Sequence, residues 1–384
     1  MAKVLLGDVV DRVKDKVDKD ATDLEYYVGG EHIDGDEIMV HRKGLIQGST
    51  IGPAFHMRFQ RGDVLLMSRN PHLRKASMVD FDGICSDVSY ICRTKDNDVL
   101  LQSLLPFILQ TPEFWQFAEE NKKGGLPFFL NWKDFARFEF ELQTIEWQRQ
   151  IADLLWAMER VKIAYRELIA RTDDLVKSQF IEMFGDPVDN PMGWDTKPLL
   201  MMGSCKNGMN FHSNDSGVEI NCLGVGDFKD FDVIANTHDL PMVSLNEMPS
   251  EEYLLNDGDI VFVRSNGNKT MVGRSVMVFP NDNPTVFSGF CIRYRHDDDS
   301  VIASYLLRVL KTESVRKQMY GRGANIQNLN QKTLAAINIP VPPMELQKEY
   351  VAFVEQSDKS KFAAQQALKE VTDAQKALMK KIFE

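Results

Sequence analysis

Two long stretches of the chain repeat apolar residues with helical spacing. Within residues 146–185, apolar and small side chains alternate at spacings of three and four, the pattern of a heptad seam. Its members are Ile151, Leu154, Met158, Val161, Tyr165, Leu168, Thr172 and Leu175. Residues 344–384 repeat the pattern 199 positions later with smaller members, namely Tyr350, Phe353, Ser357, Ser360, Ala364, Ala367, Val371 and Ala374. We predict two helices of roughly 60 Å each, at about 1.5 Å per residue, that pack large side chains against small ones. Two core helices of separate globular domains are the simpler alternative, but helices of this length are uncommon in such domains.

The two halves of the chain also resemble each other outside these helices. The segment GDVLLMSRN, which begins at Gly62, matches GDIVFVRSN, which begins 196 positions later at Gly258. Further along the separation is 199, and the matching pairs are Gly124 and Gly323, Asn131 and Asn330, Phe135 and Leu334, Phe138 and Ile337, Phe140 and Ile339, and Gln148 and Gln347. A drift of three residues is what an insertion in a surface loop produces. The chain is therefore predicted to contain an internal repeat.

Each half has the same predicted order of elements. Short apolar strands come first, at 64–67 and 88–92 in the first half and at 260–263 and 275–279 in the second. A helix follows at 102–121 and at 301–320, then an alternating strand at 135–142 and at 334–341, then the long helix. We therefore predict an α+β fold with two repeated mixed α/β domains, 1–145 and 186–343, and two long helices, 146–185 and 344–384.

Composition excludes several classes of protein. The chain has 384 residues and a net charge of −11, so it is not a uniformly basic nucleic-acid coat, although local basic patches remain open. No apolar run approaches the roughly 18 residues of a membrane span, and the N-terminus does not read as a signal peptide. Five cysteines form no C-x-x-C pair, which argues against a disulfide framework and a zinc ribbon. These features predict a cytoplasmic protein with reduced thiols and no contact with a membrane.

Motifs for catalysis are missing from the sequence. Residues 267–270 lack the spacing of a phosphate-binding loop, and the Gly-x-Gly at 224–226 lacks a third glycine. The seven histidines are scattered, with no H-x-x-x-H pair on a helix. We therefore predict a protein that is not itself an enzyme and holds neither a cofactor nor a metal.

Basic, amide-rich loops follow the matching strands of the two halves. Residues 58–75 contain five Arg and Lys against one acid, and residues 308–332 contain six against one. Arg, Asn and Gln can contact base edges through two hydrogen bonds, whereas Lys, Ser and backbone amides hold phosphates. The predicted DNA-contacting residues are Arg69, Asn70, His72, Arg74, Lys75, Lys122, Lys123, Arg264, Ser265, Asn266, Asn268, Lys269, Arg274, Arg322, Asn325 and Gln327. Ordinary hydrophilic turns would have a similar composition, but their duplication at matching points favours contact with DNA.

The order of these motifs resembles a known family. The segments that carry the resemblance are 258–265, the GRG run at 321–323 through Asn330, the IPVPPMELQ run at 339–347, and MFGDP at 183–187 up to Gly193 and Trp194. Together they resemble the DNA-specificity subunit of type I restriction–modification systems over essentially the whole chain. The first half departs from the pattern, with ELQT at 141–144 in place of the proline run and Ser68-Arg69 in place of Arg264-Ser265.

The resemblance implies a reader without chemistry of its own. It implies two target-recognition domains, each of which reads one half of a split, asymmetric double-stranded DNA site, separated by two antiparallel helices that form a coiled coil and set the spacing. It also implies docking of two methylation subunits, which use S-adenosylmethionine to methylate adenine N6, and of two restriction/motor subunits that use ATP and Mg²⁺. Cofactors are thus expected on the partners and none on this chain.

Two alternatives remain open from the sequence. One is the reader subunit of a related type II-like methylase/nuclease, and the other is a coiled-coil adaptor that binds proteins rather than DNA. A DNA reader should lose affinity linearly with the logarithm of salt concentration, whereas an adaptor need not bind oligonucleotides.

Overall fold

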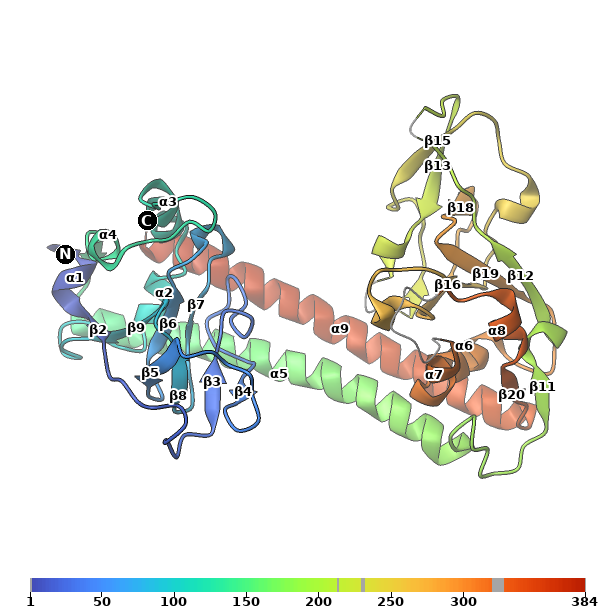
Figure 1. Ribbon diagram of the computed structural model, residues 1–384, viewed down its shortest axis with the longest axis horizontal. Helices are drawn as coiled ribbons and strands as arrows, with labels where there is room; N and C mark the ends of the chain where they lie inside the picture. The colour runs from blue at the N-terminus through green and yellow to red at the C-terminus, as the bar shows by residue number, and fades with distance from the viewer. Residues whose placement is uncertain (1, 213, 229–231, 320–327, 384) are drawn as a thin grey trace. The chain divides into compact units, whose positions relative to one another are not determined.

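The computed structural model describes residues 2–212, 214–228, 232–319 and 328–383. The chain divides into two compact units: unit 1 comprises Met1–Leu168 and Ala363–Glu384, and unit 2 comprises Ile169–Phe362. Each unit contains one mixed α/β body together with a stretch of both long helices (Figure 1).

Unit 1 contains two four-stranded sheets, a two-stranded sheet and short helices in its described residues. Its elements are β1 (Ala2–Leu5), α1 (Leu6–Val9), β2 (Val10–Val13), β3 (Tyr26–Val28), β4 (Gly44–Leu45), β5 (Phe55–Phe59), β6 (Val64–Met67), η1 (Pro71–Leu73), β7 (Ala76–Met78), β8 (Gly83–Ser86), β9 (Ser89–Thr94), α2 (Leu105–Ile108), α3 (Pro112–Glu120), α4 (Trp132–Phe135) and β10 (Glu139–Leu142). Strands β2-β9-β6-β7 form one sheet, β4-β3-β8-β5 form the second, and β1 pairs with β10.

Unit 2 repeats this arrangement. Its elements are β11 (Thr196–Pro198), η2 (Leu199–Met201), β12 (Gly203–Asn207), β13 (Val218–Leu223), η3 (Val225–Asp227), β14 (Val233–Ile234), β15 (Met242–Leu245), η4 (Glu251–Tyr253), β16 (Asp259–Val263), η5 (Lys269–Met271), β17 (Ser275–Val278), β18 (Thr285–Phe287), β19 (Cys291–His296), α6 (Ala303–Lys311), α7 (Glu313–Met319), α8 (Gln331–Ala335) and β20 (Asn338–Pro340). The order β12-β19-β16-β17-β14 corresponds to the first sheet of unit 1, β15-β13-β18 to the second, and β11 pairs with β20 as β1 does with β10.

The central strand of each unit is buried at every position because both of its faces are covered, and it is apolar except for Asp259 at the start of β16. In β6, Val64 and Leu66 face a core shared with the helices, whereas Leu65 and Met67 face the second sheet. Strand β16 does the same, since Ile260 and Phe262 belong to one core and its other apolar residues to another. A strand buried on both faces loses the alternation of polar and apolar residues, so these segments appear as continuous apolar runs.

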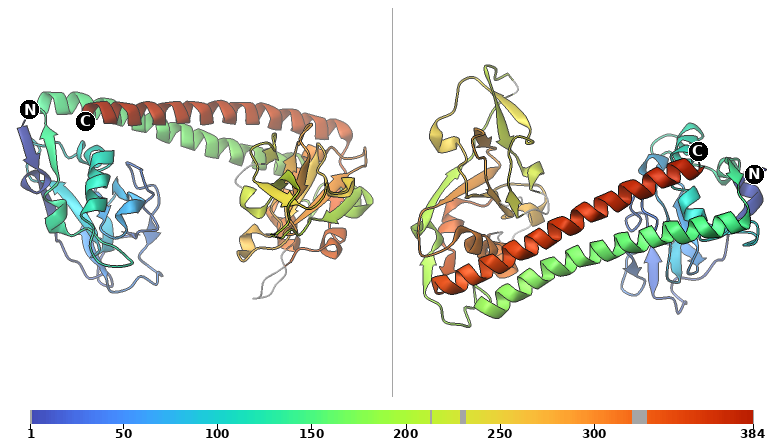
Figure 2. Two further views of the ribbon diagram at one scale, coloured as in Figure 1. Left: turned by 90° about the horizontal axis from the view of Figure 1, so that it is seen from above. Right: turned by 180° about the vertical axis from the view of Figure 1, so that it is seen from behind.

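The long helices are α5 (Ile145–Phe184) and α9 (Met344–Phe383). In unit 1 their stretches lie side by side in all views (Figures 1 and 2), and Gln375 donates to the carbonyl oxygen of Leu155 at 3.2 Å. In unit 2, Tyr350 donates to the carbonyl oxygen of Val176 at 3.2 Å. Also in unit 2, Lys361 pairs with Asp173 at 2.6 Å. This contact lies later in α9 but earlier in α5 than that of Tyr350 with Val176, so the two helices pack antiparallel in this unit.

The predicted seam of α5 is wrong at every second position. Leu154, Val161 and Leu168 are 46%, 42% and 49% exposed. The residue after each of the first two, Leu155 and Lys162, is buried instead. Polar residues that pair with one another occupy part of the seam. A register derived from apolar positions alone therefore places the seam one residue too early in the sequence.

Some short elements also differ from the prediction. The predicted helix 102–121 is two helices, α2 and α3, because Pro112 begins α3 and the Thr111 hydroxyl caps it by accepting from the amide of Phe114. The predicted helix 301–320 is likewise divided into α6 and α7, and its residue 320 lies outside the described residues. The alternating strands predicted at 135–142 and 334–341 begin late, since α4 and α8 occupy their first residues.

Candidate nucleic-acid interface

The two basic segments of unit 1 lie next to each other. The amide of Asn70 donates to the carbonyl oxygen of Phe128 at 2.8 Å, and that of Leu130 donates to Ser68 at 2.8 Å. Lys123 and Phe129 exchange backbone hydrogen bonds of 2.8 and 3.0 Å. Residues 128–130 thus form a strand-like bridge that lies between the loop after β6 and the predicted basic turn at 121–125 and is hydrogen-bonded to both.

Within the loop of unit 1, three predicted contact residues are exposed: Arg69, His72 and Arg74. Asn70 and Arg74 both have left-handed backbone conformations, with φ of 53° and 51°, and they flank the single turn of η1. These two sharp changes of direction hold the loop in a defined shape rather than an extended one.

The lysines of unit 1 have partners within the unit. Lys75 donates to the carbonyl oxygen of Gly30 at 2.5 Å, and Lys122 pairs with Glu119 at 2.6 Å. Lys123 lies 3.2 Å from Asp134, although its side chain is 57% exposed. Lys123 therefore remains accessible to a phosphate, whereas Lys75 helps to fix the loop.

The loop of unit 2 has the same construction. The amide of Leu329 donates to the carbonyl oxygen of Arg264 at 2.9 Å, and Ser265 bridges to Asn328 as Arg69 bridges to Phe129. The turn η5 replaces η1, and Asn268 caps it by accepting from the amide of Thr270 at 3.0 Å.

The other predicted residues of unit 2 lie as follows. Asn266 accepts from the amide of Asn268 at 2.7 Å, and the Arg264 guanidinium donates to the carbonyl oxygen of Gly289 at 3.1 Å. Lys269 is exposed, and Arg274 is partly buried where the loop rejoins β17. The predictions at Arg322, Asn325 and Gln327 lie outside the described residues.

Each unit has an ion pair between a buried Asp and a partly exposed Arg that supports its loop, and the sequence reasoning missed both pairs. Asp63 accepts two hydrogen bonds from Arg93, at 2.7 and 2.8 Å, and Asp259 accepts two from Arg295, at 2.9 and 2.7 Å. Each carboxylate also accepts from the backbone amide three residues earlier, which closes the turn before the central strand. The repeated Gly-Asp dipeptide was the available signal, but its Arg partner lies on a strand about 30 residues away and the sequence pattern does not connect them.

One buried glutamine anchors each α/β body to a long helix. The sequence identified these two residues only as matching positions of the repeat and did not predict their role. Gln148 of α5 accepts from the amide of Leu101 at 3.0 Å and donates to the carbonyl oxygen of Val99 at 2.9 Å. Gln347 of α9 accepts from the amide of Ile302 at 2.8 Å and donates to the carbonyl oxygen of Ser300 at 3.0 Å. The repeat therefore extends to individual side-chain hydrogen bonds.

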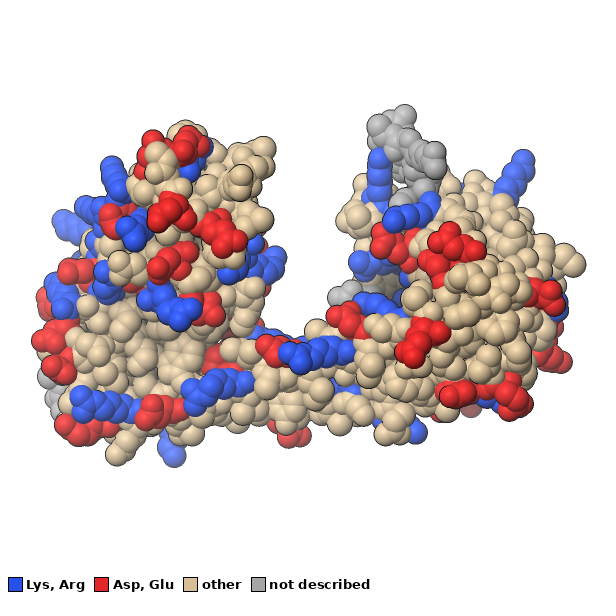
Figure 3. All heavy atoms as spheres, turned by 90° about the horizontal axis from the view of Figure 1, so that it is seen from below, with Lys and Arg blue, Asp and Glu red and all other residues tan. Residues whose placement is uncertain are grey.

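Charges of both signs mix on the surface. On the face of unit 1 shown in Figure 3, Lys and Arg alternate with Asp and Glu and do not merge into one basic surface. This fits the acidic net charge and leaves the candidate loops as local basic features.

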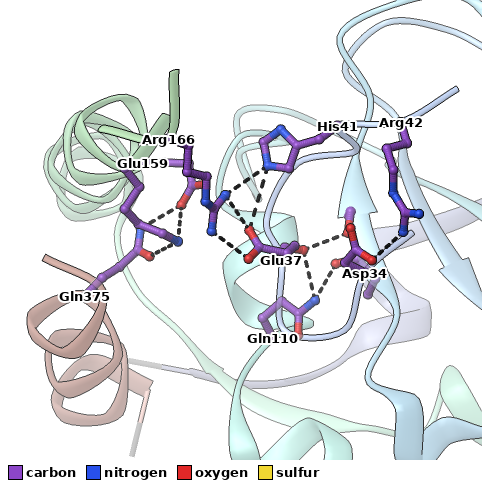
Figure 4. A network of polar contacts seen from close by, with 11 residues as sticks. Asp34, Glu37, His41, Arg42, Gln110, Glu159, Arg166 and Gln375 are labelled. Carbon is purple, nitrogen blue, oxygen red and sulfur yellow. Dashed lines mark hydrogen bonds and ion pairs between the residues drawn. The ribbon is translucent and has the colours of Figure 1, made fainter. Parts of the chain in front are cut away.

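One cluster could in principle hold a metal. Ligand atoms of Glu37, His41 and Glu159 lie within 4.8 Å of one another. Arg166 already binds Glu37 at 2.7 Å (Figure 4), and Lys162 binds Glu159 at 2.8 Å. Two cations neutralise two carboxylates here, so a further divalent ion would meet repulsion, and the cluster is an ion-pair network.

The cysteines have the properties of structural thiols. All five are free, and burial raises the pKa of Cys85, Cys205 and Cys222 to about 12 and that of the others further in the same direction. Because the thiolate is the reactive form, these groups are unsuited to nucleophilic chemistry near neutral pH. No helix in the described part of the chain is long and apolar enough to cross a bilayer.

Comparison with known proteins identifies the class of this architecture. Two solved structures share the fold along the chain: the S subunit of a type I restriction–modification system from M. genitalium, with a TM-score of 0.57 and 15% identity, and a chain from work on complex assembly and conformational transition of the type I system, with 0.56 and 21%. They cover 100% and 99% of this chain, each over 96% of its own length. The predicted α+β fold is therefore confirmed.

Sequence comparison leads to the same family. Residues 228–372 match the model of the type I restriction modification DNA specificity domain. The chain is 27% identical over 202 residues to the StySPI specificity subunit of Salmonella potsdam, covering 50% of this chain and 43% of that protein. It is 24% identical over 172 residues to the putative MjaX specificity subunit of Methanocaldococcus jannaschii, covering 44% and 37%. Each alignment spans less than half of the curated relative, and the resemblance to type I specificity subunits is confirmed.

Proposed function

We propose that this chain is the non-catalytic DNA-recognition subunit of a type I restriction–modification complex. In this proposal each unit reads one half of a split, asymmetric double-stranded DNA site. The observation that carries it is the recurrence, in both units, of one strand–loop–strand segment with a basic, amide-rich loop on the same framework of an Asp–Arg ion pair and an anchoring Gln. Loops on a rigid framework can differ in sequence without disturbing the fold, which suits two readers of different half-sites.

The chemistry would belong to partner subunits. Two methylation subunits would supply S-adenosylmethionine and flip the target adenine, because a base must leave the duplex before it is methylated. Two restriction/motor subunits would supply ATP-dependent movement and Mg²⁺-dependent cleavage. This chain would direct them, and its two long helices would set the spacing of the half-sites. A DNA target and ATP-using partners imply a cytoplasmic location.

An exposed apolar stripe on α5 supports docking of a partner in unit 1. Leu154, Val161 and Leu168 recur every seven residues and are each more than two-fifths exposed. Val161 also lines a shallow apolar groove between α5 and α9, together with Met158 and Val371. Regularly spaced exposed apolar residues on a helix favour packing of another helix, and we assign this surface to a methylation subunit.

The proposal is tested by DNA binding of the complex reconstituted with its methylation subunits. Replacing Arg69 by alanine should cost about 1–3 kcal/mol on the specific site and relax one position, if Arg69 reads a base. Replacing Lys269 should weaken binding to all sequences alike and reduce the salt slope by about one. Lys348→Gln, which removes an exposed Lys paired with Glu345, is the matched control and should change neither. Binding that is independent of sequence and salt in the wild-type complex would refute the proposal and favour a protein-binding adaptor.

A further inference from the structure

A buried polar layer interrupts the apolar seam of the helix pair in unit 1. Glu159, Lys162 and Gln375 are at most 3% exposed. Lys162 donates to Glu159 at 2.8 Å and to Gln375 at 2.9 Å, and Gln375 reaches back to the carbonyl oxygen of Leu155. Buried polar groups are costly unless they are paired. A helix register that separated these groups would leave charges unpaired, so the layer fixes the register of α5 against α9 in this unit.

One turn beyond this layer, Arg166 projects from α5 to the loop before β4 (Figure 4). Its guanidinium donates to both carboxylate oxygens of Glu37, at 2.7 and 2.9 Å, and lies 3.1 Å from the Nε2 atom of His41. Asp34 and Arg42 pair at 2.5 Å and close the loop on itself. A bidentate pair of hydrogen bonds between guanidinium and carboxylate fixes the relative orientation of the two side chains as well as their distance.

The same loop is tied to the candidate reading loop. The Gln110 side-chain amide donates to the carbonyl oxygens of Glu37 at 3.2 Å, Arg74 at 3.3 Å and Ala76 at 2.6 Å. The amide of Asp36 also donates to the carbonyl oxygen of Arg74 at 3.1 Å. A continuous chain of hydrogen bonds thus runs from Arg166 on the helix, through Glu37 and Gln110, to the backbone of the loop that carries Arg74.

Hydrogen bonds from α5 hold the α/β body of unit 1 at three separate points. Gln148 holds it near the start of the helix, the Trp156 indole donates to the carbonyl oxygen of Ser103 at 2.7 Å, and Arg166 holds it 18 residues after Gln148, or about 27 Å at 1.5 Å per residue. Arg166 is the farthest of the three along the helix, so its loss would shorten the attached stretch and free the loop that carries Glu37.

We propose that the Arg166–Glu37 ion pair is a positioning element that sets the orientation of the first reading loop on the spacer helix. It thereby determines how strictly the complex measures the distance between its two half-sites, although neither residue contacts DNA. This inference rests on the proposed function and adds to it a specificity determinant outside the reading loops.

The test compares binding of the reconstituted complex to duplexes that differ only in spacing. Once the split site is known from methylation mapping, three duplexes carry its half-sites at the native spacing, one base pair closer and one base pair farther. One base pair moves a half-site by about 3.4 Å and rotates it by about 35°. The wild-type complex should prefer the native spacing by about tenfold or more.

Arg166→Gln and Glu37→Gln should each reduce that preference about fivefold, mainly by improving the relative affinity for altered spacings. The double exchange Glu37→Arg with Arg166→Glu should restore part of the preference, because the ion pair is re-formed with reversed polarity. Lys177→Gln, which removes an exposed cation of the same helix that pairs with Asp174, is the control and should leave the preference unchanged.

The possible outcomes separate the two proposals. A purely structural role predicts equal weakening on all three duplexes, with the preference unchanged, and that result would overturn the positioning role alone. A wild-type complex without any spacing preference would overturn both the positioning role and the proposed reading of a split site.

Discussion

Units 1 and 2 share a framework and differ in how a loop next to the central sheet is held. Both have the Asp–Arg ion pair at the start of the central strand and the buried Gln that anchors the body to a long helix. In unit 1 the loop before β4 is tied to α5 through Glu37 and Arg166. At the matching place in unit 2, Asp232 pairs with Arg308 and Lys311 of α6.

That difference leaves a space in unit 2. A cavity of about 600 Å³ is lined by Asp232 and Arg308 as well as by Asp173, Tyr350 and Lys361 of the long helices. The repeat has thus kept the Asp–Arg ion pair and the anchoring Gln in both units and changed the partners of the loop next to the central sheet.

Removing the carboxylate of the shared ion pair should damage both units equally. Asp63→Ala and Asp259→Ala each remove the carboxylate partner of an Arg and the acceptor of a backbone amide, and should cost about 3 kcal/mol of unfolding free energy. Arg295 would keep its hydrogen bond to the carbonyl oxygen of Leu254. Hydrogen exchange followed by mass spectrometry reports each unit separately. Asp174→Ala, which breaks an exposed pair with Lys177, is the control and should cost less than about 0.5 kcal/mol. Costs that differ by more than about 1.5 kcal/mol between the units would show that the framework is not equivalent.

Loss of the anchoring glutamine should have a somewhat smaller effect. Gln148→Ala and Gln347→Ala each remove the hydrogen-bond partner of one backbone amide and of two carbonyl oxygens. We expect each replacement to lower the free energy of unfolding by about 2 kcal/mol, as measured by urea unfolding. A strong effect in one unit and none in the other would break the proposed equivalence of the anchors.

The Glu37 contact should give unit 1 a particular pH dependence. Burial by itself raises the pKa of Glu37, but the neighbouring His41 side chain and the two hydrogen bonds from Arg166 outweigh it and lower the pKa from 4.5 to about 2. A carboxyl whose pKa is lower in the folded state stabilises the protein above pH 4.5, and the contribution is lost as pH falls toward 2. Glu37→Gln should therefore cost about 1 kcal/mol at pH 7 and progressively less below pH 4.5, as measured by urea unfolding at a series of pH values. A cost that is independent of pH would refute the charge-based account.

The smallest effect is expected for the exposed stripe on α5. Leu154→Gln should change the unfolding free energy by less than about 0.5 kcal/mol, whereas Leu155→Ala, one residue later and fully buried, should cost about 3 kcal/mol. Thermal unfolding of the isolated chain distinguishes them. If the two costs were reversed, the heptad register first predicted from the sequence would be the correct one.

The sequence was a good guide to the long helices because their ends carry local signals. The predicted ranges 146–185 and 344–384 differ by at most one residue from Ile145–Phe184 and Met344–Phe383. Gly185 adopts a φ of +74°, the left-handed conformation typical of the residue after a helix. The proline run before Met344 marks the other boundary.

The seam between the helices was harder to predict, because its register depends on polar residues. Glu159, Lys162 and Gln375 can be buried only because they satisfy one another. A rule that assigns polar residues to the surface places them outside, and it shifts the seam to the exposed Leu154 and Val161. Pairing over more than 200 residues of sequence is a property of the folded state.

The candidate loops illustrate the same limit. Their position after the central strand and their basic character followed from the repeat, and the structure brings residues 68–75 and 121–125 together. The contacts that shape them, such as Asp63 with Arg93 or Gln110 with Arg74, join residues some 30 or more positions apart. Composition reveals which residues could contact DNA, but only tertiary contacts show how a loop is held.

The most direct test of the account is methylation mapping in cells that express this chain with its methylation subunits. We expect adenine methylation at one split motif with a fixed gap, and a variant with Arg69 and Arg74 replaced by alanine should relax or lose one half of the motif while the other half stays unchanged. A continuous palindromic motif, or relaxation of both halves by changes confined to unit 1, would contradict the account.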